Sequence, residues 1–430
     1  MNTINKIVWV VAISLIFLNG IYFSFKLKFP QLKIKKILNK IKNTSKSKES
    51  ISSLDTLFIS LASKLGAGSL SGIALAIYYG GIGTIFWIWI STFFTSINCY
   101  LENILAIKYK EKDGKYNKGG PSYYINKGLG KKKLSIIYAI LAIAAYIIGF
   151  ITIQNNTITT LITNTYNCSS ILITSIITIL STIFIFKGIK TISKACNKIV
   201  PIMTSIYIIL GIIVLIKNLK IMPLLLINIV KDAFSLKSVT GGIISSFIIG
   251  IQKSIFASEA GVGTSAIASA TSDNNDPIKQ GYYGIIETFF INFVITTITA
   301  LMIITSNFHI LNLKNINGIE ITDFAFYFHF GNIGKFFLLT VLILFCFSTI
   351  ITCYYYGESN LKILTNNKKT IFLLKIFTIV ILFIGGIAKS SFVWTTGDIL
   401  IGLLSIINIY AINKLESVII KEHKNNKYIE

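Results

Sequence analysis

The sequence predicts a polytopic α-helical membrane protein with about eleven transmembrane helices. Of its 430 residues, 53% are hydrophobic and only 13% are charged, whereas a soluble domain carries roughly 25% charged residues. Apolar runs recur along the whole chain, each long enough to cross about 30 Å of hydrocarbon as a helix. These runs are solid, whereas the strands of a membrane β-barrel alternate apolar and polar residues. A soluble enzyme and a β-barrel are therefore excluded.

Hydropathy places the candidate spans in order along the chain. We expect them at about residues 6–26, 54–79, 83–107, 134–161, 170–187, 199–216, 240–270, 281–306, 335–356, 371–387 and 393–412. The first span has the position of a signal peptide, but it lacks a small-x-small cleavage site and its apolar run is too long. It is expected to be a retained helix.

The net charge of +24 reflects lysine alone, because the chain has no arginine. Heavy use of Lys, Ile and Asn is typical of an AT-rich bacterial genome, so we expect no nucleic-acid partner. With the N-terminus placed outside, the cytoplasmic segments hold 30 lysines and the external ones 8, as the positive-inside rule requires. The N-terminus is predicted outside and the C-terminus in the cytoplasm, in the plasma (inner) membrane. The five cysteines and three histidines show no metal-binding spacing.

Two spans are too rich in glycine for continuous helices. Gly66-Ala-Gly-Ser69 and Gly261-Val-Gly-Thr264 share a G-x-G-[ST] core, and each Gly costs about 1 kcal/mol relative to Ala in a helix. Each core falls in the first helix of a five-helix block, and five is odd, so the blocks enter the membrane from opposite sides. This predicts an inverted repeat with two broken helices and a transport site between them. The alternative is that these glycines only allow close helix packing.

The predicted organisation has four parts. They are an extra helix with a basic cytoplasmic linker (1–50), a first repeat (51–220), a second repeat (221–415) and a cytoplasmic tail (416–430). Lys64 and Glu259 each lie two residues before a glycine core, and ionisable residues at membrane depth are functional candidates. We expect Lys64 and Glu259 to be gate elements or structural partners. The alternatives are that they contact the substrate directly or that their side chains lie towards the membrane interface.

Several motifs resemble the alanine or glycine:cation symporter family. They are 66–72 (GAGSLSG) with 73–83 and 86–89, 108–113, Gly-Gly-Pro within 119–125, 127–129, 255–263, 276–281, 345–350, 355–358 and, weakly, 394–398. The resemblance covers nearly the whole chain. It implies a sodium-coupled importer of small neutral amino acids with the five-plus-five inverted repeat of the leucine-transporter type.

The resemblance also implies site residues. Substrate contacts are expected from Gly66, Ala67, Gly68, Ser69, Gln154, Phe256, Ala257 and Ser258, and sodium ligands from the carbonyls of Ala62 and Leu65 with the hydroxyls of Ser348 and Thr349. The alternatives are that Gln154 only joins helices and that the two hydroxyls bond to their own helix. The family pattern has Thr and Asn where this chain has Ala67 and Ser69, and Ser and Asn where it has Ala257 and Ser258. The substrate can therefore differ from alanine.

The predicted function is sodium-coupled import of alanine, glycine and, as a third candidate, serine. Sodium is the coupling ion, and no other cofactor and no obligate protein partner are expected; the lipid bilayer is the surroundings. A proton-coupled or exchange-type amino-acid transporter is the alternative. An intramembrane enzyme would need clustered His, Asp or Arg, which is missing, and the inverted repeat favours alternating access over a channel or a sensor.

Overall fold

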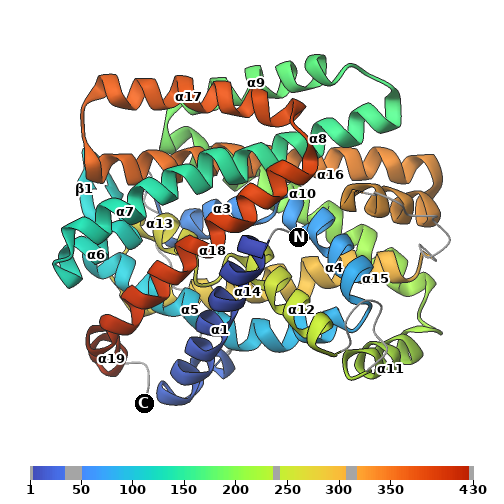
Figure 1. Cartoon of the computed structure of the whole chain (residues 1–430), viewed down its shortest axis with the longest axis horizontal. Coiled ribbons are helices and arrows are strands. Elements are labelled where there is room, and N and C mark those ends of the chain that lie inside the picture. Colours follow the sequence, from blue (N-terminus) through green and yellow to red (C-terminus); the bar gives the residue numbers. More distant parts are fainter. Residues whose placement is uncertain (1–2, 34–50, 236–242, 307–316, 426–430) are drawn as a thin grey trace.

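The computed structural model describes residues 3–33, 51–235, 243–306 and 317–425 and is almost entirely helical (Figure 1). The basic linker and the end of the tail lie largely outside the described residues. The helices are α1 Thr3–Lys26, η1 Pro30–Leu32, α3 Ser53–Lys64, η2 Gly68–Gly72, α4 Ile73–Gly80, α5 Thr84–Tyr109, α6 Pro121–Leu129, α7 Lys132–Ile143, η3 Ala144–Phe150, α8 Ile151–Tyr166, α9 Ser170–Lys187, α10 Ile189–Lys217, α11 Met222–Ala233, α12 Ile243–Ser258, α13 Thr264–Ala270, α14 Pro277–Phe289, η4 Phe290–Thr296, α15 Thr297–Ile304, α16 Gly318–Leu364, α17 Lys368–Ile387, α18 Ser390–Lys414 and α19 Glu416–Lys424.

Nine helices of the described chain are long and apolar enough to cross a membrane. A tenth span is the pair formed by α3 and the η2–α4 segment, which is bent by 55° at residues 65–67. The predicted span 240–270 consists of two shorter helices, α12 and α13. Whether it crosses the membrane as an eleventh span stays a prediction.

Several contacts between a helix of one predicted repeat and a helix of the other have a counterpart in which the two repeats exchange places. α8 packs against α17, and α16, its predicted counterpart, packs against α9. In the same way α18 packs against η3 and α8, and α10 packs against α16. α5 contacts α12 and α13, while α14 and α15 contact α3 and α4. Such exchanged pairs are what a twofold relation between the repeats requires, so they support the inverted repeat.

The outer helices carry the apolar surface. α9 and α17 lie side by side along one edge of the bundle (Figure 1). Both expose large aliphatic and aromatic side chains, among them Leu172, Ile179, Leu373 and Ile384. In water such a face would be unfavourable, and in a membrane it faces lipid. The polar side chains are gathered instead in the interior, around α3, α13 and α14.

The segment between α5 and α7 forms regular structure of its own. β1 (Glu111–Asp113) and β2 (Tyr116–Lys118) form an antiparallel hairpin in which Glu111 pairs with Lys118. The hairpin leads into α6, which begins at Pro121 after Gly120. Proline suits this first helical position because its missing N–H would have no partner there. The Gly-Gly-Pro motif therefore makes a turn that starts a short helix.

Candidate functional site

The first break in the chain lies between α3 and η2. α3 begins with a capping box formed by Ser52 and Asp55 and ends at Lys64. Leu65 then leaves the helical conformation, with φ −78° and ψ 70°. The chain resumes as the π-helical turn η2 from Gly68. The break is fully buried, so its free backbone groups must find partners inside the protein.

Gln154 supplies one of these partners. Its side-chain Oε1 accepts a hydrogen bond of 2.8 Å from the backbone N–H of Ala67. A Cβ atom on Gly66 would lie only 2.5 Å from that oxygen and 2.8 Å from Oγ1 of Thr349. Gly66 is therefore required for α8 and α16 to reach the backbone of the break. The predicted glutamine lies at the break, and one of its two polar groups holds the broken helix.

Two hydroxyls of α16 meet α3 beside this point. Thr349 Oγ1 lies 3.0 Å from the Ala62 carbonyl oxygen, and Ser348 Oγ lies 3.3 Å from the same atom. Both hydroxyls also lie 2.9 Å from the Phe345 carbonyl of their own helix. Each hydroxyl thus has at least two acceptors for one hydrogen, and all these groups are buried. The structure brings together three of the four predicted sodium ligands, and the fourth, Leu65, lies three residues after Ala62 in the chain.

Gly68 faces an aromatic stack. A Cβ atom on Gly68 would lie 3.1 Å from the ring of Phe256. That ring stacks on Trp394 with a centroid distance of 5.5 Å and on Phe150 at 6.2 Å. The Lys253 ammonium lies 5.2 Å from the centroid of the Phe256 ring. Phe256 is therefore the aromatic residue that faces Gly68, and its ring lies between those of Phe150 and Trp394.

The second break lies between α12 and α13. Glu259, Gly261 and Gly263 all have positive φ, of 53°, 81° and 101°. At Gly263 a Cβ atom would lie 2.3 Å from Pro121 Cγ, so only glycine fits between this break and α6. Ser258 bonds back to the Ser254 carbonyl at 2.7 Å, so this hydroxyl is satisfied within α12. Ala257 is buried in the same helix end.

The buried ion pair of the site is not the one between Lys64 and Glu259. The Lys64 ammonium lies 2.7 Å from Glu287 Oε1 and donates a second hydrogen bond of 2.9 Å to Ser265 Oγ. The side chains of this pair are 0% and 2% exposed. Lys64 therefore joins α3 to both α13 and α14. Glu259 lies near enough to interact with Lys64 electrostatically but does not form the ion pair.

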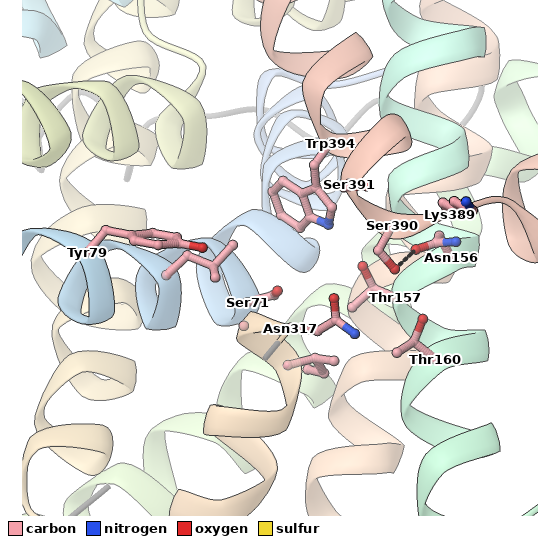
Figure 2. Close-up of a pocket in the computed structure, with 13 residues that line it drawn as sticks. Ser71, Tyr79, Asn156, Thr157, Thr160, Asn317, Lys389, Ser390, Ser391 and Trp394 are labelled. Carbon is pink, nitrogen blue, oxygen red and sulfur yellow. Dashed lines mark hydrogen bonds between the residues drawn. The ribbon is translucent and has the colours of Figure 1, made fainter. Parts of the chain in front are cut away.

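A polar cavity of about 550 Å³ opens beyond Trp394. Figure 2 shows hydroxyl and amide groups from four segments around it, including the hydrogen bond of 2.7 Å from Ser390 Oγ to Asn156 Oδ1. Its lining comes from η2–α4, α8, the start of α16 and the α17–α18 turn: Ser71, Leu75, Tyr79, Asn156, Thr157, Thr160, Asn317, Gly318, Ile319, Lys389, Ser390, Ser391 and Trp394. Trp394 lines this cavity, and its ring stacks on Phe256, which faces Gly68 of the first break.

Three buried residues of this region were missed. Glu287 pairs with Lys64, Glu102 accepts a hydrogen bond of 2.8 Å from Asn408 Nδ2, and Asn408 also donates to the Gly261 carbonyl at 3.0 Å. Glu287 and Glu102 are isolated acidic residues in predicted apolar spans. The rule that singled out Lys64 and Glu259 would have found both, had it been applied to every span.

Comparison with known proteins agrees with this geometry. The chain matches the model of the sodium:alanine symporter family over residues 1–429. It is 34% identical to the probable sodium/glutamine symporter GlnT of Bacillus subtilis, over 96% of this chain and 87% of that protein. It is 32% identical to the amino-acid carrier protein AlsT of the same organism (99% and 91%) and 30% identical to the sodium/alanine symporter AgcS of Methanococcus maripaludis (98% and 96%). The chain therefore belongs to the sodium:alanine symporter family and is a multi-pass, cation-coupled amino-acid symporter, a transporter and not an enzyme.

Proposed function

We propose that this symporter couples the inward sodium gradient to the import of small neutral amino acids, with alanine and glycine as the main substrates and serine as a third. One observation carries the proposal. The Ser348 and Thr349 hydroxyls meet the Ala62 carbonyl beside a helix break whose glycines leave backbone exposed to a ligand. A cation site and an amino-acid site would then share the same break.

The proposed sodium site consists of oxygen atoms only. Small hard cations take oxygen ligands from carbonyls and hydroxyls. Ala62, Ser348 and Thr349 would supply three such oxygens, and the carbonyl of the non-helical Leu65 would supply the fourth. A bound ion would also resolve the competition of two acceptors for each hydroxyl hydrogen, because the hydroxyl oxygen can ligate the ion while its hydrogen bonds to Phe345.

The proposed amino-acid site lies between Gly68 and Phe256. The backbone N–H group of Gly68 begins the outward half of the broken span, whereas the N–H of Ser69 already donates to the Gly66 carbonyl at 3.2 Å. A helix N-terminus attracts a carboxylate by roughly 0.3–1 kcal/mol or more when buried. The substrate ammonium would meet carbonyls at 256–258. Gln154 would contact the substrate through its Nε2 group, because its Oε1 holds Ala67. Phe256 limits the side chain to a small one.

Transport would proceed by alternating access in the plasma membrane, with the N-terminus outside and the C-terminus in the cytoplasm. The cavity lined by Trp394 would face outwards and admit the substrate, and the stacked rings of Trp394 and Phe256 would separate it from the site. Movement of these rings would open the path from the cavity to Gly68. The 55° bend of the broken span provides the joint at which its two halves tilt separately.

Uptake by purified protein in proteoliposomes tests the proposal. A sodium gradient should drive accumulation of labelled alanine, glycine and serine, and removal of sodium should abolish it. A pH gradient in sodium-free buffer should drive none. Accumulation under that pH gradient, or label movement only against a preloaded amino acid, would replace the proposal by proton coupling or exchange.

Competition by glutamine addresses the substrate separately. One relative bears the name of a probable sodium/glutamine symporter and another that of a sodium/alanine symporter. The aromatic wall beside Gly68 favours the smaller substrate here, so unlabelled alanine should compete for uptake far better than glutamine. Stronger competition by glutamine would place glutamine first among the substrates and leave sodium coupling intact.

A further inference from the structure

The interior of the described chain holds more carboxyl groups than cations. Glu102, Glu259 and Glu287 are all at most 2% exposed, and they surround one buried lysine, Lys64, which is 3% exposed. The three carboxyl groups and the lysine are near enough to interact with one another electrostatically. Lys64 is paired with Glu287 at 2.7 Å. Two buried carboxyl groups are therefore left without an ion pair among the described residues.

Each of the two remaining groups has one oxygen atom without a hydrogen-bond partner. In Glu102 that atom is Oε1, while Oε2 accepts the 2.8 Å hydrogen bond from Asn408. Glu259 lies within the second break, and its Oε2 has no hydrogen-bond partner. The Thr264 hydroxyl, fully buried beside the Glu259 carboxyl, has no partner that meets hydrogen-bond geometry either. The break thus contains an unpaired acid next to an unpaired hydroxyl.

The charge state of Glu259 depends on the neighbouring groups that can carry charge or titrate. Around Glu259 these are Lys64, Glu102, Glu287, Tyr146, Cys353 and Tyr356, from α3, α5, α14, η3 and α16. Lys64 alone among them supplies positive charge, and Glu287 already neutralises it. An ionised Glu259 would therefore be an unpaired charge at membrane depth, which is strongly unfavourable.

A metal ion does not fit this excess of acid. Nowhere in the described residues do three or more His, Cys, Asp or Glu side chains converge as metal ligands would. The unpartnered oxygen of Glu259 is a single atom beside a single hydroxyl. A proton requires only one such oxygen atom with one hydroxyl beside it. It neutralises the carboxylate, and the resulting acid can donate a hydrogen bond to the Thr264 hydroxyl.

We propose that the second break is a proton-binding site in which Glu259 is held as a neutral carboxylic acid next to Thr264. This site is separate from the proposed sodium site, and it stands whichever amino acid is carried. Water entering the break would take the proton as hydronium and leave a carboxylate. The break would then bind a proton in the closed arrangement and release it when hydrated.

Infrared spectroscopy of the purified protein at neutral pH tests the proposal without a transport assay. The carbonyl stretch of a protonated acid is distinct from carboxylate bands and shifts in heavy water. We expect Glu259→Gln to remove one such acid band, because Gln has the shape of the protonated acid. The matched control Glu422→Gln removes a partly exposed carboxylate paired with Lys108 and should leave the acid bands unchanged.

Two further variants keep the proposal testable if Glu259→Gln does not fold. Thr264→Val keeps the volume but removes the hydroxyl, so it should retain the acid band and shift its frequency. Glu102→Gln should leave that band in place. The proposal is overturned if the band persists in Glu259→Gln, if it is lost in Glu102→Gln instead, or if Thr264→Val leaves its frequency unchanged.

Discussion

The buried ion pair between Lys64 and Glu287 is expected to contribute to stability only as a pair. We consider the changes Lys64→Met and Glu287→Met, which keep length and volume but remove the charge. The pair is 2.7 Å long with both side chains at most 2% exposed. Removal of one partner leaves a buried charge, and for Lys64 its remaining hydrogen bond is the one to the Ser265 hydroxyl at 2.9 Å.

The magnitude follows from the general behaviour of such pairs. Breaking a buried ion pair by removing one partner costs roughly 3–5 kcal/mol, whereas replacing both partners by apolar residues is often neutral. Each single variant should therefore lower the free energy of unfolding by about 3–5 kcal/mol. The double variant should lie within about 1 kcal/mol of the parent protein, so the two effects are far from additive.

The assay is reversible unfolding in mixed micelles for the four proteins of this double-mutant cycle. Lys108 and Glu422 provide the matched control, because their ion pair has the same length of 2.7 Å but side chains that are 48% and 18% exposed. An exposed pair contributes about 0–1 kcal/mol, so the corresponding methionine variants should have small effects. Losses at Lys64 and Glu287 that simply add in the double variant would refute the reasoning.

Three further predictions concern the first break and the polar segment that follows α5. Ser348→Ala with Thr349→Ala should raise the sodium concentration for half-maximal uptake at least several-fold, whereas Thr340→Ala, an exposed hydroxyl on the same helix, should not. Gly66→Ala should abolish uptake and lower the melting temperature, because its Cβ would lie 2.5 Å from Gln154 Oε1. Burial lowers the pKa of Lys110, which donates to the Ser272 and Asn274 carbonyls, to about 8. Since the unfolded lysine keeps its proton up to its ordinary pKa of about 10.4, stability should rise between about pH 8 and 10, and Lys110→Met should remove that rise.

The spans could be predicted from local sequence because a long apolar stretch is stable as a helix in a membrane wherever it occurs in the chain. The bend at Gly66–Gly68 could also be predicted from local sequence, since clustered glycines weaken a helix. The short helix α6 and the β1–β2 hairpin were not foreseen. They depend on tertiary contacts, such as the Tyr123 hydroxyl donating to the Ser359 carbonyl at 2.9 Å, and not on hydropathy.

The candidate site also combines features that could be predicted from the sequence with features that depend on tertiary contacts. The family resemblance implied that Ser348 and Thr349 would face Ala62, and their hydroxyls lie 3.3 and 3.0 Å from its carbonyl oxygen. The partner of Lys64 could not be read from one sequence, because Glu287 lies 223 positions away and the pairing depends on how α3 packs on α14. Gln154 was expected to contact the substrate, but its Oε1 atom accepts a hydrogen bond from Ala67 and so stabilises the break itself. Buried backbone groups compete with the ligand for the same side chains.

Gly68 and Gly72 offer the sharpest distinction between a binding glycine and a packing glycine, because both lie in η2, one turn apart. A Cβ atom on Gly68 would lie 3.1 Å from the Phe256 ring, on the side where the substrate carboxylate is proposed, whereas on Gly72 the nearest atom would be Trp394 Cη2 at 4.0 Å. Gly68→Ala should therefore weaken alanine binding at least tenfold with little change in melting temperature, since the ring needs to move only a few tenths of an ångström. Gly72→Ala should leave both binding and melting unchanged. A bulkier Gly68→Val should abolish binding in a protein that still folds. If Gly68→Ala lowers the melting temperature but binds alanine normally once folded, Gly68 serves packing and the carboxylate site lies elsewhere.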